Sequence, residues 1–140
     1  MEKVMNEEVG RDDVGSQGSE TTVLRRVLIV DDNLALAENV AEMLQLAGYT
    51  TQVSASAEEA FPRALERETD VVVTDFRLPG MSGAQFVRRI LAARADIRAM
   101  VISAYTDDAT IEEASAAGAA FMAKPLDLVR LSGWVGDAQA

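Results

Sequence analysis

The sequence predicts an α/β fold, with one doubly wound, five-stranded parallel sheet in a single domain. Short aliphatic and β-branched runs alternate five times with segments whose apolar residues recur at helical spacing. The central run, Val71–Asp75, is apolar without alternation, which is typical of a strand buried on both faces. Repeated strand–helix units favour right-handed crossovers and helices on both faces of the sheet.

The first two units occupy residues 27 to about 65. Val27–Val30 is the first expected strand, and the helix after it stops at Gly48, which suits a left-handed C-cap. This helix carries apolar residues at helical spacing: Ala37, Val40, Ala41, Leu44 and Ala47. Thr50–Val53 is a short strand, and Ser56–Glu59 is a capping-box pattern. The second helix places five residues on one face: Ala57, Ala60, Phe61, Ala64 and Leu65. Pro62 lies inside it and is expected to kink it.

The third and fourth units follow the central strand. Ser82–Gln85 is expected to cap a helix. Its inward residues are Phe86, Val87, Ile90 and Leu91. Ala99–Ile102 is the fourth strand and ends in Ser103. Thr106 or Asp107 can cap the next helix. That helix turns Ile111 and Ala114 inward and stops at Gly118.

The last unit begins with the short strand Ala120–Ala123, which ends at Lys124. A final helix is indicated by Leu128, Leu131 and Val135. Two glycines weaken it, Gly133 and Gly136.

Length and composition limit the functional classes. The 140 residues suit one domain, which we place at residues 23–140, after an acidic segment at 1–22 that we expect to be disordered. A net charge of −10 argues against nucleic-acid binding. No apolar run approaches the roughly 20 residues of a membrane span. The lack of cysteine excludes disulfides, and we expect a cytoplasmic protein.

Two compositional features bear on chemistry. The chain has no histidine, so it has neither an imidazole base nor a phosphohistidine of its own. Of its thirteen basic residues only Lys3 and Lys124 are lysines. A single lysine among arginines in the folded part indicates a need for a compact point charge.

Reactive residues end four of the predicted strands: Asp31 with Asp32, Asp75, Ser103 and Lys124. The carboxyl ends of parallel strands share one edge, where open α/β folds bind ligands. Three carboxylates together repel one another unless a cation joins them, and an all-oxygen site suits Mg²⁺. With a lysine and a hydroxyl added, the set suits phosphoryl transfer, with Asp75 as nucleophile.

These motifs resemble the receiver domain of two-component response regulators. The similarity covers about residues 25 to 138 and rests on Asp31-Asp32, on Asp75 within Asp-x-x-x-Pro-Gly-Met-Ser-Gly, on Ser103-Ala104 and on Lys124-Pro125. It implies a flavodoxin-like sheet with strand order 2-1-3-4-5. It also implies that Asp75 accepts a phosphoryl group from a partner histidine kinase.

The resemblance also implies a role for each site residue. Asp32 binds Mg²⁺ directly and Asp31 mainly through water, with Asp75 and the Arg77 carbonyl as further ligands. Lys124 bridges to the phosphoryl oxygens, and its bond to Pro125 is cis.

A switch and a tuning pair follow from the same resemblance. Ser103 moves to the phosphoryl group, and Phe121 rotates inward behind it, although Phe121 lacks the hydroxyl often present there. These movements rebuild the face made by the fourth helix, the fifth strand and the last helix. Arg77 and Tyr105 occupy positions that tune phosphoryl lifetime, and their bulk predicts a long-lived phosphoryl group.

Two rival functions are disfavoured by single positions. A haloacid dehalogenase-type phosphatase needs a second acid two residues after its nucleophile, where this chain has Arg77. A flavodoxin-like FMN site needs a hydroxyl-rich or glycine-rich phosphate loop after the first strand, where Asp31 and Asp32 repel phosphate. We expect no enzymatic activity beyond the protein's own phosphorylation and dephosphorylation.

The sequence leaves several alternatives for what the phosphorylated protein acts on. We expect a protein–protein interaction without nucleic acid or membrane, and a monomer or a weak phosphorylation-dependent dimer. The alternatives are a phosphorelay shuttle that passes the phosphoryl group to a histidine phosphotransfer protein, and a receiver module of a longer regulator. The initiating methionine and the acidic segment argue mildly against the last.

Overall fold

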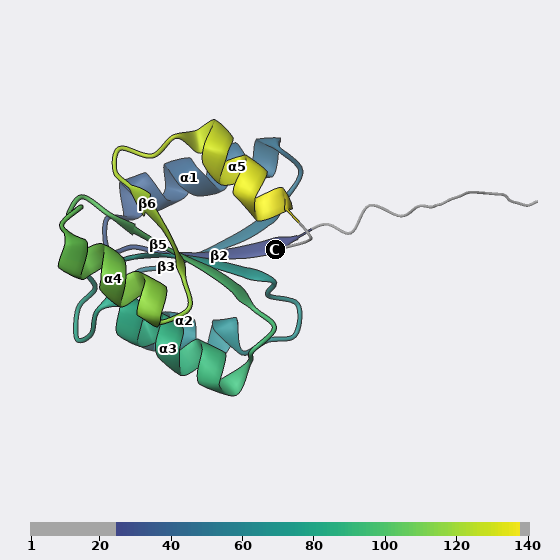
Figure 1. Cartoon of the computed structure of the whole chain (residues 1–140). Coiled ribbons are helices and arrows are strands. Elements are labelled where there is room, and N and C mark those ends of the chain that lie inside the picture. The colour runs from purple at the N-terminus through teal and green to yellow at the C-terminus, as the bar shows by residue number, and fades with distance from the viewer. Residues whose placement is uncertain (1–24, 138–140) are drawn as a thin grey trace, which may run out of the picture.

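Helices cover both faces of a parallel sheet in the computed structural model, which describes residues 25–137 (Figure 1). The elements in chain order are β2 (Arg26–Val30), α1 (Leu34–Leu46), β3 (Thr50–Ser54), α2 (Ala57–Ala64), β4 (Val71–Asp75), α3 (Gly83–Ala93), β5 (Arg98–Ser103), α4 (Asp108–Ala116), β6 (Ala120–Ala123) and α5 (Leu128–Gly136). The segment expected to be disordered, residues 1–22, lies outside the described residues.

The sheet has the order β3-β2-β4-β5-β6, and each neighbouring pair is parallel. Numbered along the chain this order is 2-1-3-4-5, so the predicted topology is confirmed. All five residues of the central strand β4 are buried. Its register places Asp75 opposite Ile102, and Ser103 lies opposite Ala123 on the next strand. The polar strand ends therefore collect at one edge of the sheet.

Two apolar layers hold the helices to the sheet. On one face, α1 and α5 pack over alternate strand residues such as Ile29, Val73 and Ile102. On the other face, α2, α3 and α4 cover Leu28, Val72 and their neighbours. The inward residues predicted for α3 are buried or half-buried: Phe86, Val87, Ile90 and Leu91. Alternation along β4 thus sends neighbouring valines into opposite layers.

Capping serines begin two of the helices. At α3 the capping box is complete, because the Ser82 hydroxyl accepts the Gln85 N–H at 3.1 Å and the Gln85 side chain accepts the Ser82 N–H at 3.0 Å. At α2 the expected box is only half formed. Ser56 accepts the Glu59 N–H at 3.1 Å, but the Glu59 carboxylate accepts the N–H of Ala55. Gly48 and Gly118 adopt the left-handed backbone expected after α1 and α4.

The phase of α4 differs from the prediction. Asp107, not Thr106, is its N-cap, and the inward residues are Thr110 and Ala114, while Ile111 is 37% exposed. Thr110 tolerates burial because its hydroxyl donates to Asp107 Oδ1 at 2.9 Å, which satisfies the polar group.

Two residues expected to continue helical stripes lie beyond the helix ends instead. Leu65 is the C-cap of α2 and is 38% exposed, so the buried stripe of that helix ends at Ala64. Ala47 is likewise the C-cap of α1 and is exposed. The α2 helix continues through Pro62 and ends two residues later. Helix α5 includes both Gly133 and Gly136.

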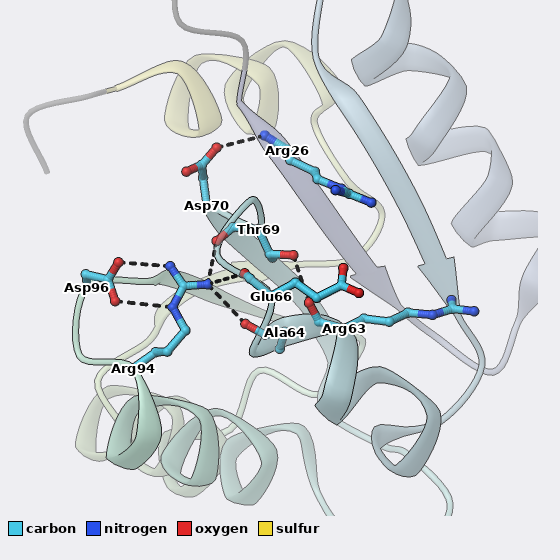
Figure 2. Close-up of polar contacts among 8 residues, drawn as sticks. All are labelled: Arg26, Arg63, Ala64, Glu66, Thr69, Asp70, Arg94 and Asp96. Atoms are coloured by element: carbon cyan, nitrogen blue, oxygen red, sulfur yellow. Dashed lines mark hydrogen bonds and ion pairs between the residues drawn. The ribbon is translucent and has the colours of Figure 1, made fainter.

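Arg94 follows α3 and contacts the segments that precede β4 and β5, at the end of the sheet away from the reactive residues (Figure 2). Its guanidinium donates to the carbonyls of Ala64, Glu66 and Thr69 at 3.2, 2.7 and 2.8 Å, and it pairs with Asp96 at 2.8 Å. The connection between α2 and β4 is therefore fastened to the C-terminal end of α3. Within residues 25–137, no helix has the length and apolarity needed to cross a membrane.

Candidate phosphorylation and metal site

Backbone pairing brings the polar strand ends together. Asp31 directly follows β2, and its N–H donates to the Ser54 carbonyl at 3.0 Å. Asp75 is the last residue of β4, and Ser103 is the last residue of β5. The Lys124 N–H donates to the Ser103 carbonyl at 2.8 Å, so hydrogen bonding of the sheet continues into the site.

Three carboxylates form one acidic cluster. Each of Asp31, Asp32 and Asp75 offers an oxygen, and these oxygens lie within 4.8 Å of one another. Asp31 is 1% exposed and Asp75 is 9% exposed, whereas Asp32 faces solvent. Asp31 Oδ1 accepts the Asn33 N–H at 2.9 Å, which orients its carboxylate. Such an all-oxygen donor set fits a hard divalent cation, as the sequence predicted.

Lys124 supplies the positive charge of the site. Its Nζ lies 3.2 Å from Asp75 Oδ1 and 3.4 Å from Asp31 Oδ2. Burial lowers the pKa of Lys124, but the charges of Asp75 and Asp31 and their hydrogen bonds outweigh that cost and raise the pKa above its usual value. Lys124 is therefore protonated throughout the physiological range. The Lys124–Pro125 bond is cis, as the resemblance implied.

The ionised form of Asp75 is disfavoured by its surroundings, so the pKa of Asp75 is raised. Burial raises the pKa of Asp75, and the charge of Asp31 raises it further, against the opposing effect of Lys124. Part of the cost of ionising this carboxylate is left uncompensated by the protein itself. A cation bound to the cluster would stabilise the ionised form of this carboxylate.

The loop after Asp75 folds back against the strand. The Gly83 N–H donates to the Phe76 carbonyl at 2.7 Å, and Arg77 faces Ser82 as an isolated antiparallel pair. A Cβ at position 83 would run into the Asp75 carbonyl, so only glycine permits this approach. Thr74 also contributes, because its buried hydroxyl donates to the Asp75 carbonyl at 3.0 Å.

The residues expected to act as a switch flank the acidic cluster without joining it. The buried Ser103 hydroxyl accepts the Tyr105 N–H at 2.9 Å. Phe121 is half-buried and packs against the layer between α3, α4 and β5. The Arg77 guanidinium stacks 4.3 Å from the centre of the Tyr105 ring, which is 48% exposed. The two proposed tuning residues therefore contact each other beside the site.

Some contributors to the site were missed from the sequence. Asn33 donates its backbone N–H to the Asp31 carboxylate, a contact that does not depend on the side chain. Thr74 donates its hydroxyl to the Asp75 carbonyl, and a short polar residue beside an acid carries no distinctive signal. A contact between Ser82 and Glu113 on α4 spans 31 positions of the chain, so no local pattern could indicate it.

Comparisons with known proteins agree with this geometry. The model of the response regulator receiver domain family matches residues 27–135. A response regulator receiver protein of Anaeromyxobacter sp. (strain Fw109-5) is 37% identical over 109 residues, covering 77% of this chain and 46% of the relative. Sporulation initiation phosphotransferase F of Bacillus subtilis (strain 168) is 30% identical over 104 residues, covering 74% of this chain and 84% of the relative. The match spans less than half the length of the Anaeromyxobacter relative and of several others.

Solved structures share the same architecture. Chemotaxis protein CheY4 of Vibrio cholerae matches with a TM-score of 0.74 at 27% identity, covering 81% of this chain and 97% of the other. The BeF3-activated DrrB receiver domain matches with a TM-score of 0.74 at 25% identity, covering 81% and 95%. From the family match, the strand order and the acidic edge of the sheet, it follows that the chain belongs to the receiver domain family of two-component response regulators, which act as phospho-acceptor switches.

Proposed function

We propose that this protein is a phospho-accepting response regulator in which Asp75 receives a phosphoryl group from a partner histidine kinase. Receiver domains accept phosphoryl groups from histidine kinases and bind Mg²⁺ at an acidic pocket. The observation that carries the proposal is the meeting of three carboxylates with Lys124, whose Nζ contacts both Asp75 and Asp31. Because these 140 residues contain no histidine, the phosphohistidine donor would lie outside them.

The metal ligands follow from the same cluster. Asp31, Asp32, Asp75 and the backbone carbonyl of Arg77 would hold Mg²⁺, an ion that prefers carboxylate, carbonyl and water oxygens. When bound, the ion offsets negative charge on the carboxylates and on the transferred group.

The chain's own residues carry the transfer. A carboxylate oxygen of Asp75 attacks phosphorus in line, and the phosphorus–nitrogen bond of the donor breaks, returning its electron pair to the imidazole. Lys124 exchanges its contact with Asp75 for one with a phosphoryl oxygen. It thereby stabilises charge that moves outward from the carboxylate.

The output face is formed by α4, β6 and α5. Ser103 would turn from the Tyr105 N–H to a phosphoryl oxygen, and Phe121 would rotate into the space behind it. The phosphoryl group then favours one of two packings through contacts made only in that packing. The resulting surface change would be recognised by a partner protein in the cytoplasm.

Incubation with acetyl phosphate and Mg²⁺, followed by intact mass spectrometry, tests the proposal. One added phosphoryl group is expected, and it should disappear in Asp75→Asn and after removal of Mg²⁺. Asp96→Asn, a matched change at the opposite edge of the sheet, should keep the gain. Absence of any modification of the native protein would refute phospho-acceptor function.

A relay role is the second candidate. The Bacillus subtilis relative is named a phosphotransferase, and the match covers 84% of its length, compared with 46% of the Anaeromyxobacter relative. In a relay, Asp75 would pass the group onward to a histidine phosphotransfer protein. Mixing the phosphorylated protein with such a domain and following the label separates the two roles, since only a shuttle loses its phosphoryl group to the domain's histidine.

A further inference from the structure

The loop between β4 and α3 contains the backbone carbonyl of Arg77, which accepts no hydrogen bond from residues 25–137. Arg77 and Ser82 face each other, but the hydrogen bond that joins the two segments runs from the Gly83 N–H to the Phe76 carbonyl. In such a pair the backbone groups of the two facing residues point away from each other. Within residues 25–137 no hydrogen bond reaches the Arg77 carbonyl, so it stays available as a ligand.

Ser82, the last residue of this loop, makes three hydrogen bonds, two to Gln85 on α3 and one to Glu113 on α4. Its hydroxyl accepts the Gln85 N–H, and its own N–H donates to the Gln85 side chain, at 3.1 and 3.0 Å. The same hydroxyl donates to Glu113 Oε2 on α4 at 3.4 Å. One residue therefore joins the loop at residues 76–82, which we call the metal loop, to the first turn of α3 and to helix α4.

We propose that Ser82 is a positioning residue that holds the Arg77 carbonyl for Mg²⁺, and that Glu113 holds Ser82. This inference rests on the proposed function. Loss of the Ser82 hydroxyl frees the first turn of α3, which carries the Gly83 N–H. The bond from Gly83 to Phe76 then loosens, and Arg77 loses its fixed place opposite position 82.

The structure contains a matched reference for this role. Ser56 caps α2 with the same bond to the third residue of its helix, also at 3.1 Å. Among the hydrogen bonds of residues 25–137, the Ser56 side chain makes none to another element. The two serines therefore share the capping function and differ in the link to the metal loop.

Mg²⁺ titration followed by backbone amide NMR tests the proposal on the intact chain. Ser82→Ala should weaken Mg²⁺ binding about tenfold, the lower end of the cost of losing a group that supports a metal ligand. Ser56→Ala should leave the dissociation constant unchanged while shifting the urea midpoint by a similar amount, since both changes remove one N-cap. Ser82→Thr keeps the hydroxyl and should restore native affinity.

A second pair of variants isolates the link to α4. Glu113→Ala leaves the cap intact and should weaken Mg²⁺ binding by roughly threefold, as expected for an exposed contact. Glu112→Ala, an exposed neighbour without a partner among the described residues, should have no effect.

The outcomes separate this inference from the proposed function. Native protein that fails to bind Mg²⁺ contradicts the phospho-acceptor proposal itself. Native binding with equal losses in Ser82→Ala and Ser56→Ala overturns the positioning role alone. Native affinity in Glu113→Ala overturns the part assigned to Glu113.

Discussion

The Lys124 ammonium lies between two carboxylates, 3.2 Å from Asp75 Oδ1 and 3.4 Å from Asp31 Oδ2. Lys124→Met removes the cation and leaves both acids buried together. In the metal-free protein at pH 7 to 8 we expect a loss in the free energy of unfolding on the order of 2 kcal/mol. Urea unfolding at a series of pH values measures this loss.

The pH dependence of that loss in the free energy of unfolding follows from the titration of Asp75, whose pKa is raised in the folded protein. Its pKa is already raised by burial and by Asp31, and loss of Lys124 raises it further. A carboxyl group whose pKa is higher in the folded state favours folding at low pH, and that contribution is lost as pH rises through the folded-state pKa. The free energy of unfolding of the variant should therefore approach the native value at about pH 4 and drop below it at higher pH. Lys124→Arg keeps the charge and should retain most of the stability, and a deficit independent of pH would contradict the electrostatic origin.

Asp75→Asn should stabilise the metal-free protein. The isosteric amide removes the cost of ionising a buried carboxyl group beside Asp31. The gain should be roughly 1 kcal/mol at pH 7 to 8, a usual size for a single substitution. It should shrink as pH falls, because Asp75 then becomes neutral in the native protein too, and shrink again when Mg²⁺ is added.

Asp96 provides a control of opposite sign. A hydrogen bond from Arg94 lowers the pKa of Asp96, so its ionised form favours the folded state. That contribution is present above the ordinary pKa and is lost as pH falls through the lower folded-state value. Asp96→Asn should therefore destabilise the protein at neutral pH and have little effect in acid. If both asparagine variants shifted stability in the same direction, the assignment for Asp75 would be wrong.

The site was predictable from the sequence where polar residues directly follow buried strands. Asp31, Asp75 and Ser103 each end or follow such a strand. Lys124 follows the mostly half-buried edge strand β6, and the parallel sheet brings these ends together. Helix phase was harder to predict. The buried position in α4 is Thr110 and not its neighbour Ile111, a shift of one residue. Which of the two faces inward depends on whether Thr106 or Asp107 caps the helix.

Contacts between distant segments were not predictable from local patterns. Arg94 bonds carbonyls 25 to 30 positions away, and the stacking of Arg77 on Tyr105 joins two different loops. Arginines and exposed tyrosines show no spacing that identifies their partners. Only the assembled sheet sets these distances.

Gly83→Ala should damage both stability and the site. The new methyl group would meet the backbone carbonyl of Asp75, which has no freedom to move aside. We expect a loss of about 2 to 3 kcal/mol in the free energy of unfolding, as is usual for overpacking, together with weaker Mg²⁺ binding. Gly133→Ala is the matched control, because nothing lies within 4 Å of its new methyl group and alanine favours the helix by about 0.5 to 1 kcal/mol. Equal effects of the two changes would contradict the close approach at Gly83.

The stacked pair of Arg77 and Tyr105 should lengthen the life of the phosphoryl group on Asp75. The two side chains lie 4.3 Å apart beside the site and can obstruct the path of an attacking water molecule. Replacing both with alanine should shorten the half-life several-fold, which is about 1 kcal/mol of lost protection. Phosphate release from protein labelled with acetyl phosphate measures this.

Arg98→Ala is the control for the stacked pair. Arg98 makes a similar stack, 4.1 Å from the Trp134 ring, and also donates to the Trp134 carbonyl at 2.6 Å. It begins β5, at the edge of the sheet opposite the site, so its removal should lower stability and leave the half-life unchanged. A native half-life no longer than that of the double variant would show that the pair does not shield the acyl phosphate.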